Sequence, residues 1–289
     1  AAIKRQGIET IITATPVMNK DFRWDLTNTF SYLIKNPVTS LLPGVDRILL
    51  AGGSFGTRFA RAFQQVNQDW GQLIGGGIAR NSEGKMLIKS NGTYLADADK
   101  HWGSVIPKVN GGLSQMFHYK NWDLNINLDY QVGGKFFSLS EQWGTFSGLL
   151  DWTAATNDKG KNVRDDVSAG GGVHVVGVDA ADGKTPVDMY VDAQTYYHQF
   201  YFNRVAEPFV HDLTYVKLRE VSLGYQIPVR KIGISKWVQG AVVSVIARNP
   251  WLIYSAAKNF DPSEISAVQG EDGQYPGTRS VGVNIKLNF

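Results

Sequence analysis

A two-residue alternation of apolar and polar side chains recurs along this chain and limits the folds that it can adopt. It is cleanest in NWDLNINLDYQV, residues 121–132, where every odd-numbered position is Asn, Asp or Gln. The even-numbered positions carry Trp122, Leu124, Ile126, Leu128, Tyr130 and Val132. This pattern predicts a β-strand with one apolar and one polar face. The run is longer than the ~5–6 residues of an ordinary strand and exceeds the ~9–11 residues with which a tilted strand crosses a bilayer.

The composition of the two faces favours a membrane strand. The apolar face carries no charge and has Trp122 and Tyr130 near its ends, where aromatic residues meet the membrane–water interfaces. The polar face is a set of amides and carboxylates, which suits a water-filled lumen: Asp123, Asn125, Asn127, Asp129 and Gln131. A strand of a soluble sandwich also has a polar face, but such strands are shorter and usually carry Lys, Glu and Thr there.

Other segments repeat the alternation. Residues 22–34 place aromatic and aliphatic side chains on one phase, and residues 215–227 do so with a change of phase near the middle. Either a β-bulge or a strand leaving the membrane explains that change. We expect about eight to ten long strands in all. The mean hydropathy of −0.20 does not separate a soluble β protein from a barrel, because only alternate barrel residues face lipid.

The last segment, SVGVNIKLNF, alternates up to the final residue. One phase consists of Val281, Val283, Ile285, Leu287 and Phe289. In a transmembrane barrel the last strand pairs with the first, which leaves no unpaired edge in the lipid. We therefore predict that these residues form a barrel-closing strand. A sandwich strand that happens to be last remains the alternative.

Two long polar stretches, residues 36–112 and 135–210, separate the strands. Loops of this length usually carry function, and residues 173–178 have the pattern of a small hairpin within one of them. Aromatic residues there could contact the rings of a sugar or the side chains of a peptide, and the candidates are Trp143, Trp152, Tyr196 and Tyr197. The same residues could instead fold the loops onto one another.

Few residues suggest catalysis or cofactor binding. The chain has no cysteine, its five histidines are scattered without metal-ligand spacing, and its net charge of +3 is spread out, which argues against a nucleic-acid partner. GGSFG, residues 52–56, matches the nucleophile-elbow pattern around Ser54, and the segment after it could be a helix. An α/β-hydrolase needs more strands before this motif, so a glycine-rich bend is the better interpretation. We expect no enzyme and no cofactor.

Several longer motifs resemble those of one family. DLTYVKLREVSLGYQIP (212–228) and RNPWLIYSAAKNFDPSE (248–264) are similar to the late barrel segments of SusC/RagA-type TonB-dependent transporters, as is the closing YPGTRSVGVNIKLNF. Residues 7–36 and 107–138 also resemble that family. The resemblance implies an all-β, transmembrane antiparallel β-barrel of roughly twenty-two strands, with long extracellular loops. Residues 1–289 would be a C-terminal segment of that one domain.

The same resemblance implies a function and partners. It implies TonB-dependent uptake of an oligosaccharide or a peptide across the bacterial outer membrane, with a SusD-like surface lipoprotein over the barrel. Residues 135–210 and 250–275 would then contact the substrate and the lipoprotein. The plug domain, the TonB-contacting segment and the early strands have no counterpart here, and the strand pattern close to Ala1 leads us to expect preceding sequence. A soluble carbohydrate-binding β-sandwich and a serine hydrolase using Ser54 remain as alternatives.

Overall fold

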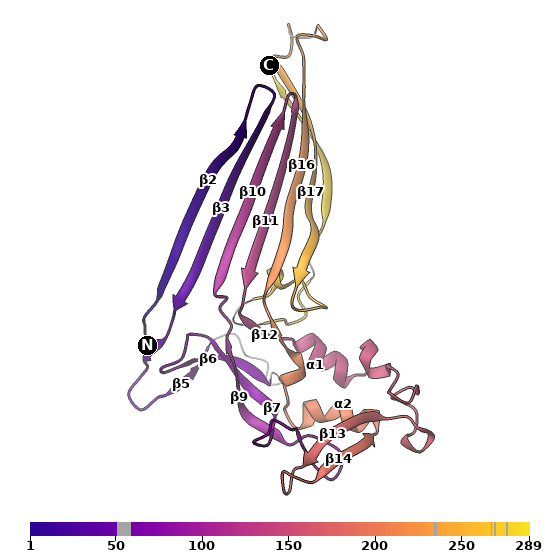
Figure 1. The fold of residues 1–289 in the computed structure, drawn as a ribbon. Helices are drawn as coiled ribbons and strands as arrows, with labels where there is room; N and C mark the ends of the chain where they lie inside the picture. The colour runs from indigo at the N-terminus through magenta and orange to yellow at the C-terminus, as the bar shows by residue number, and fades with distance from the viewer. Residues whose placement is uncertain (51–58, 234–235, 267, 269, 276) are drawn as a thin grey trace.

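The computed structural model describes residues 1–50, 59–233, 236–266, 268, 270–275 and 277–289. Its largest feature is an antiparallel sheet of seven long strands, with the other elements gathered at one end of it (Figure 1). In spatial order the strands are β18 (Ser280–Asn288), β17 (Gly240–Ser255), β16 (Tyr215–Ile227), β11 (Trp122–Val132), β10 (Val109–Tyr119), β3 (Phe22–Lys35) and β2 (Gln6–Met18).

The register of these strands aligns their apolar phases on one face. Leu124 of β11 lies opposite Phe117 of β10 and Leu223 of β16. Followed across all seven strands, that row is Val17, Trp24, Phe117, Leu124, Leu223, Val245 and Val283. The neighbouring row on the opposite face is mostly polar: Met18, Arg23, His118, Asp123, Gly224, Ser244 and Asn284. The alternation in the sequence therefore becomes one apolar and one polar face of the sheet.

A β-bulge in β16 preserves these faces where the sequence changes phase. The β16 partners of Asn127 and Leu128 are Glu220 and Leu218, which leaves Arg219 as an extra residue. Such an extra residue shifts one strand against its neighbour by one position. The parts of β16 before and after the bulge therefore direct their apolar side chains to the same face. Of the two explanations for the phase change, the bulge is confirmed.

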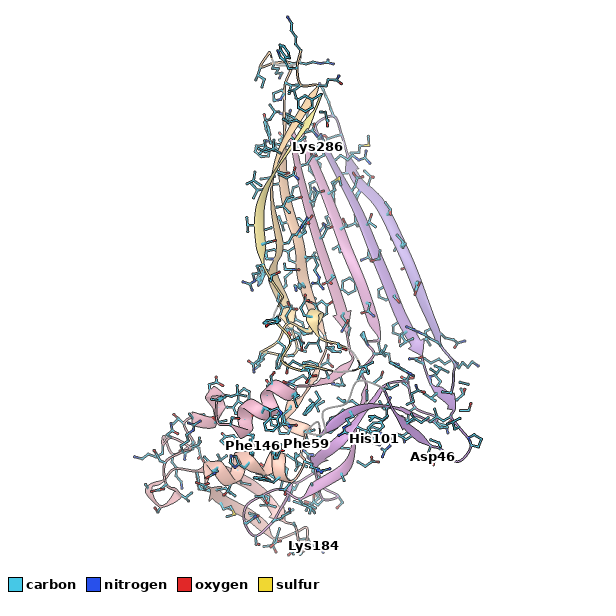
Figure 2. The ribbon with its side chains drawn as sticks, turned by 180° about the vertical axis from the view of Figure 1, so that it is seen from behind. Asp46, Phe59, His101, Phe146, Lys184 and Lys286 are labelled. Atoms are coloured by element: carbon cyan, nitrogen blue, oxygen red, sulfur yellow. The ribbon has the colours of Figure 1, made fainter. Side chains whose placement is uncertain are left out.

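A second part of the structure, which we call the loop module, comprises the described residues of 36–108 and 133–214. Figure 2 shows Asp46, His101, Phe146 and Lys184 there, at the opposite end of the sheet from Lys286. A four-stranded sheet contains β5 (Arg47–Leu49), β6 (Ala60–Gln65), β7 (Gln72–Ile78) and β9 (Ala96–Ser104). A three-stranded sheet contains β14 (Pro186–Val191), β13 (Val173–Asp179) and β8 (Leu87–Ile88). The predicted hairpin at 173–178 is confirmed, since β13 pairs with β14.

Two short helices, which the period-two pattern did not predict, complete the loop module. They are α1 (Leu139–Phe146) and α2 (Ala193–Phe202). Each is capped, since the side chain of Ser138 accepts a hydrogen bond from the Glu141 amide and that of Asp192 accepts one from Thr195. The remaining elements are two strand pairs and four short 3-10 helices: β1 (Ala2–Ile3) with β4 (Val38–Ser40), β12 (Lys135–Phe137) with β15 (Val210–Asp212), η1 (Asp151–Ala154), η2 (Val167–Ala169), η3 (Glu207–Phe209) and η4 (Pro262–Glu264).

The buried core lies in the loop module. Phe137, Phe200 and Phe209 are at most 5% exposed and belong to one cluster. The close packing depends on Gly76 of β7, where an added Cβ would lie 1.8 Å from the carbonyl oxygen of Arg204. The apolar face of the main sheet is different, because many of its side chains are exposed: Ile285 is 66% accessible in β18 and Ile12 is 58% accessible in β2. No helix in the described part of the chain is long and apolar enough to span a membrane.

Candidate functional site

The polar face of the main sheet carries connected hydrogen bonds, and it holds all five residues predicted to face a lumen. At the end of the sheet away from the loop module, the Asp123 carboxylate lies 2.6 Å from Nδ1 of His118 and accepts a hydrogen bond of 2.9 Å from Gln226. One row further, the side-chain amide of Asn125 donates to Ser222. The register places Asp123 and Ser222, which accept these hydrogen bonds, on one face of the sheet. The same face carries Asn127, Asp129 and Gln131. Whether water fills the space in front of this face stays a prediction.

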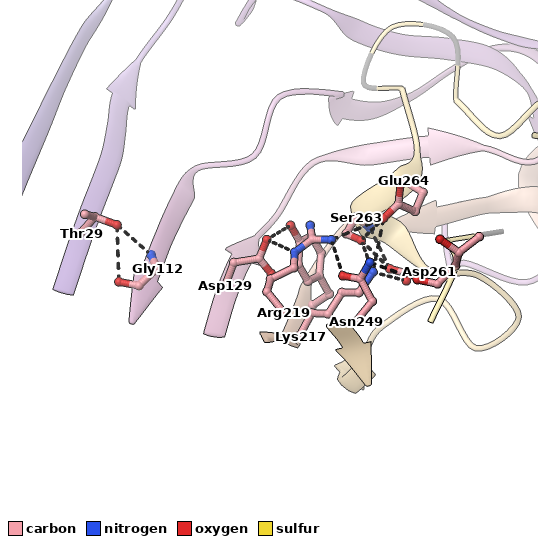
Figure 3. Close-up of polar contacts among 11 residues, drawn as sticks. Thr29, Gly112, Asp129, Lys217, Arg219, Asn249, Asp261, Ser263 and Glu264 are labelled. Carbon is pink, nitrogen blue, oxygen red and sulfur yellow. Dashed lines mark hydrogen bonds and ion pairs between the residues drawn. The ribbon is translucent and has the colours of Figure 1, made fainter. Parts of the chain in front are cut away.

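An ionic cluster occupies the loop end of the same face (Figure 3). The guanidinium of the bulge residue Arg219 donates to Asp129 at 2.8 Å, and the hydroxyl of Tyr215 lies 3.3 Å from the same carboxylate. Next to them, the ammonium group of Lys217 donates to Asp261 at 2.6 Å, and the Lys217 side chain is only 2% exposed. A charge so deeply buried is stable only with partners that neutralise it and accept its hydrogen bonds.

The predicted closing strand lies at one edge of the main sheet. β18 pairs with β17 along its whole length, from Asn288 opposite Gly240 to Ser280 opposite Arg248. Four of the five predicted residues, Val281, Val283, Ile285 and Leu287, share the apolar face, and Phe289 follows the strand and is 80% exposed. Within the described residues the other edge of β18 and the outer edge of β2 have no partner strand in this sheet. The sheet is thus open, and a first strand for β18 to meet is not observed.

The aromatic candidates of the loop module pack against one another. Trp143 in α1 lies 5.2 Å, ring to ring, from Tyr201 in α2. The indole of Trp152 donates to Thr145, and the hydroxyl of Tyr197 donates to the carbonyl oxygen of Trp152. Burial raises the pKa of the half-exposed Tyr197 phenol above its ordinary value, so this group remains a donor. These contacts agree with the interpretation that the aromatic residues fold the loops of the module onto one another.

Three of these aromatic residues also line a cavity. Trp152, Tyr196 and Tyr197 lie around an open space of about 740 Å³, in the size range of ligand sites. A polar end of this cavity is formed by Glu141, whose carboxylate accepts hydrogen bonds from His211 and from Asn259. The cavity is consistent with a role in substrate contact, which remains a prediction. Trp143 is not among its described lining residues.

The catalytic alternative finds no support in the described part of the chain. Ser54 and the rest of GGSFG lie outside the described residues. After the motif, Ala60–Gln65 form strand β6, so these residues do not supply the helix that a nucleophile elbow would require there. Among the described residues, no group of three or more His, Cys, Asp or Glu side chains is placed to hold a metal ion.

Comparison with known proteins agrees with this geometry. TonB-dependent receptor P3 of Formosa agariphila is 21% identical over 315 residues, which cover 99% of this chain and 29% of that receptor. The TonB-dependent receptor SusC of Bacteroides thetaiotaomicron is 24% identical over 317 residues, covering 100% of this chain and 26% of SusC. The chain is a homologue of the SusC-type TonB-dependent receptors. No protein-family model matches it.

Solved structures share the fold of this chain. The RagAB peptide transporter matches 99% of the chain with a TM-score of 0.66 at 19% identity, and the chain covers 29% of the matched one. The RagAB peptide importer in its closed-closed state matches 99% of the chain with a TM-score of 0.65 at 18% identity. The predicted resemblance to SusC/RagA-type receptors is confirmed. These receptors are outer-membrane proteins, as predicted for this chain.

The chain also contains functional candidates that sequence reasoning missed. Lys217 meets Asp261 and Glu264 on the polar face, yet it lies more than forty positions before them in the sequence, and the three residues belong to no short motif. For Arg219 the sequence does contain a signal. The change of phase in the alternating pattern of residues 215–227 occurs at this residue, which is the extra residue of the bulge. No sequence pattern indicated the buried carboxylate of Glu141, because its helix α1 lies within a segment that was predicted to be a loop.

A histidine in the loop module lies between two carboxylates that favour its charged form. Nε2 of His174 lies 2.8 Å from Asp188 and Nδ1 lies 2.9 Å from Asp158. Its ring stacks on Tyr190, over which Lys159 also lies. The hydrogen bond to Asp188, and then the charge of Asp158, hold the pKa of His174 above its ordinary value, despite some opposing desolvation.

This contact is expected to weaken as the pH rises. Because the folded-state pKa is raised, the stabilisation is complete below the ordinary pKa of about 6.5 and is lost as the pH passes the raised value. Amide hydrogen exchange at 173–179, corrected for intrinsic rates, should therefore speed up as the pH rises from about 6.5 through the raised pKa of His174. His174→Gln should abolish this pH dependence. Protection that increases with pH would contradict the assignment.

Proposed function

We propose that this chain forms part of the wall of an outer-membrane barrel that imports a nutrient. The observation that carries the proposal is the asymmetry of the seven-stranded sheet. One face is mostly apolar, interrupted by Asn28 and Gln115, and many of its apolar side chains are exposed. Exposed apolar surface of this extent marks an interface with lipid or with another protein. The polar face, with Asp123 to Gln131 near its centre, would line the lumen.

The strand dimensions suit a bilayer. Eleven residues of β11 span about 36 Å along the strand, and a tilt of about 45° reduces this to about 26 Å across the membrane. The apolar band of such barrels is ~25 Å tall. Trp122, whose ring centre lies 4.7 Å from that of Tyr225, is at one end of the band, and Tyr130 lies near the other. These positions agree with aromatic girdles at the two interfaces.

The arrangement of the turns gives the orientation. β2 and β3 are joined by residues 19–21, and β10 and β11 by residues 120–121, all at the end away from the loop module. Barrels of this class place short turns in the periplasm and long loops outside. We therefore place the loop module on the cell surface. In the complete receptor, β18 would pair with a first strand that precedes this chain, and Val281 to Leu287 would close the barrel against lipid.

Uptake and partners are inferred from the relatives, because the chain spans only about a quarter to a third of their length. SusC is a TonB-dependent receptor, and the RagAB structures are those of a peptide importer. By analogy, the complete protein would be energised through TonB and would work with a SusD-like lipoprotein over the loop module. The substrate would be an oligosaccharide or a peptide, bound without chemical change.

The experiment uses the full-length receptor in its own outer membrane. A folded barrel resists detergent without heating, so the unboiled protein should migrate differently from the boiled protein on a gel. Deleting the receptor gene, or removing TonB, should abolish growth on the imported nutrient, and the loss of the SusD-like protein should weaken it. Purification without detergent, with no change in mobility on boiling, would contradict the proposal.

A soluble carbohydrate-binding sandwich is the main alternative. It would bury the apolar face of the main sheet under a second sheet. In the described part of the chain the other sheets lie beyond the end of the main sheet rather than across its face (Figure 1). The sandwich is therefore less consistent with the structure than the barrel wall.

A further inference from the structure

The segment between β17 and β18 folds back over the polar face of the main sheet. We call residues 256–266 and 270–275 of this segment the strap. It begins directly after β17, at the end of the sheet that adjoins the loop module (Figure 1). The amide of Ala256 donates to the carbonyl oxygen of Thr214, so the strap starts in contact with the start of β16.

The first anchor of the strap is the buried ammonium group of Lys217. It donates to Asp261 at 2.6 Å, to Ser263 at 2.9 Å and to Glu264 at 3.3 Å. Lys217 lies opposite Asp129 in the register and therefore on the polar face. Because the side chain is 2% exposed, the strap must cover this part of the face.

The bulge in β16 adds a second cation to the same anchor. Arg219 lies 3.4 Å from both Glu264 of the strap and Asn249 of β17, in addition to its hydrogen bond with Asp129. Arg219 follows Leu218 of the apolar face and so lies on the polar face with Lys217, and the bulge places the next residue, Glu220, on the polar face as well. The bulge residue thus supplies a charge to the strap.

The far end of the strap is fixed to the start of α1. The carboxylate of Glu271, which is 4% exposed, accepts hydrogen bonds from the hydroxyls of Ser138 at 2.6 Å and Ser140 at 2.7 Å. The Glu271 amide donates to the carbonyl oxygen of Phe137. Phe260 and Ile265, which lie directly before and after the first anchor in the sequence, pack on a separate buried cluster that includes Phe136 and Leu213. The strap is therefore held at both ends and packed beside the first anchor.

We propose that the strap narrows the loop end of the lumen and limits the size of the solutes that pass along the polar face, with Lys217 and Arg219 as its positioning residues. This inference rests on the proposed barrel. Two buried anchors and a hydrophobic contact exceed what a surface loop needs in order to connect neighbouring strands. The carboxylates of Asp261 and Glu264 are neutralised by the two cations of the anchor. The strap therefore excludes solutes by its bulk rather than by its charge.

The test measures access to a cysteine behind the strap in the full-length receptor on cells. Asn127 on the polar face becomes the reporter, Asn127→Cys, in a receptor without other cysteines. A small maleimide should label it in every variant, and a bulky polyethylene-glycol maleimide should label it slowly. Lys217→Met should raise the bulky-reagent rate by about tenfold or more, because it releases the first anchor.

Two further variants separate this effect from general damage. Asp261→Asn combined with Glu264→Gln breaks the same anchor from the strap side and should give the same increase. Arg248→Met removes another cation of the same face, one that pairs with the β16 residue Glu220, and should leave the bulky-reagent rate unchanged.

The outcomes are distinct. If the bulky maleimide labels all variants at equal rates, the proposed role of the strap is overturned. The proposed function still stands in that case, provided that the receptor changes mobility on boiling. A cysteine that neither reagent reaches in any variant also overturns the inference, since something other than the strap then covers the polar face. If the receptor without any substitution migrates identically on a gel before and after boiling, the proposed function itself is overturned.

Discussion

Replacing Ile126 by arginine is expected to lower the free energy of barrel folding by about 2–4 kcal/mol. Ile126 lies near the middle of β11, on the mostly apolar face of the sheet, where its partners in the register are Val221 of β16 and Gln115 of β10. A guanidinium at this depth would be surrounded by hydrocarbon and would lose its hydration. The measurement is equilibrium folding of the full-length receptor into lipid vesicles, followed by the change of mobility on boiling.

The matched control is the next residue along the strand. Asn127→Arg adds the same charge at the same depth but on the polar face, where its partner in the register is Glu220. The cost should be far smaller, because the side chain would be solvated and opposite a carboxylate. Equal penalties at positions 126 and 127 would contradict the assignment of the faces.

Deleting Arg219 is expected to prevent assembly of the barrel wall. Removal of the bulge residue shifts one half of β16 by one position, and a one-residue shift moves every side chain of that half to the other face. Lys217 would then face lipid and lose its contact with Asp261, while Val216 and Leu218 would face the polar side. The unboiled form of the receptor should disappear from the outer membrane.

Arg219→Ala is the control for that deletion. It removes the guanidinium and its hydrogen bond with Asp129 but keeps the number of residues, and so keeps the register. Assembly should persist, with a modest loss of stability. If the deletion assembles as well as the alanine variant, the bulge does not set the faces of β16.

The main sheet was predictable because its signal is local. The side chains of Trp122 to Val132 alternate with the period of a strand, and no other element has that period. The position of the bulge was also visible as a change of phase. The pairing of β18 with β17 follows for the same reason, since consecutive antiparallel strands usually pair.

The loop module and the strap were not predictable in this way. α1 and α2 are short, and their stability comes from caps and from contacts between distant aromatic residues such as Phe146 and Tyr201. The partners of Lys217 lie more than forty positions away in the sequence, so no spacing reveals them. Burial of a lysine in a strand is decided by what covers it, and that depends on the path of the whole chain.

The most direct test of the central claim is a nitroxide scan along β11. Single spin labels at each position from 122 to 132 of the full-length receptor in lipid vesicles would be exposed to oxygen and to a water-soluble nickel complex. Lipid on one side and solvent on the other predict that even-numbered labels collide with oxygen and odd-numbered labels collide with nickel, in strict alternation. Uniform collision rates, or even-numbered labels that neither reagent reaches, would mean that protein covers the apolar rows and would contradict the account.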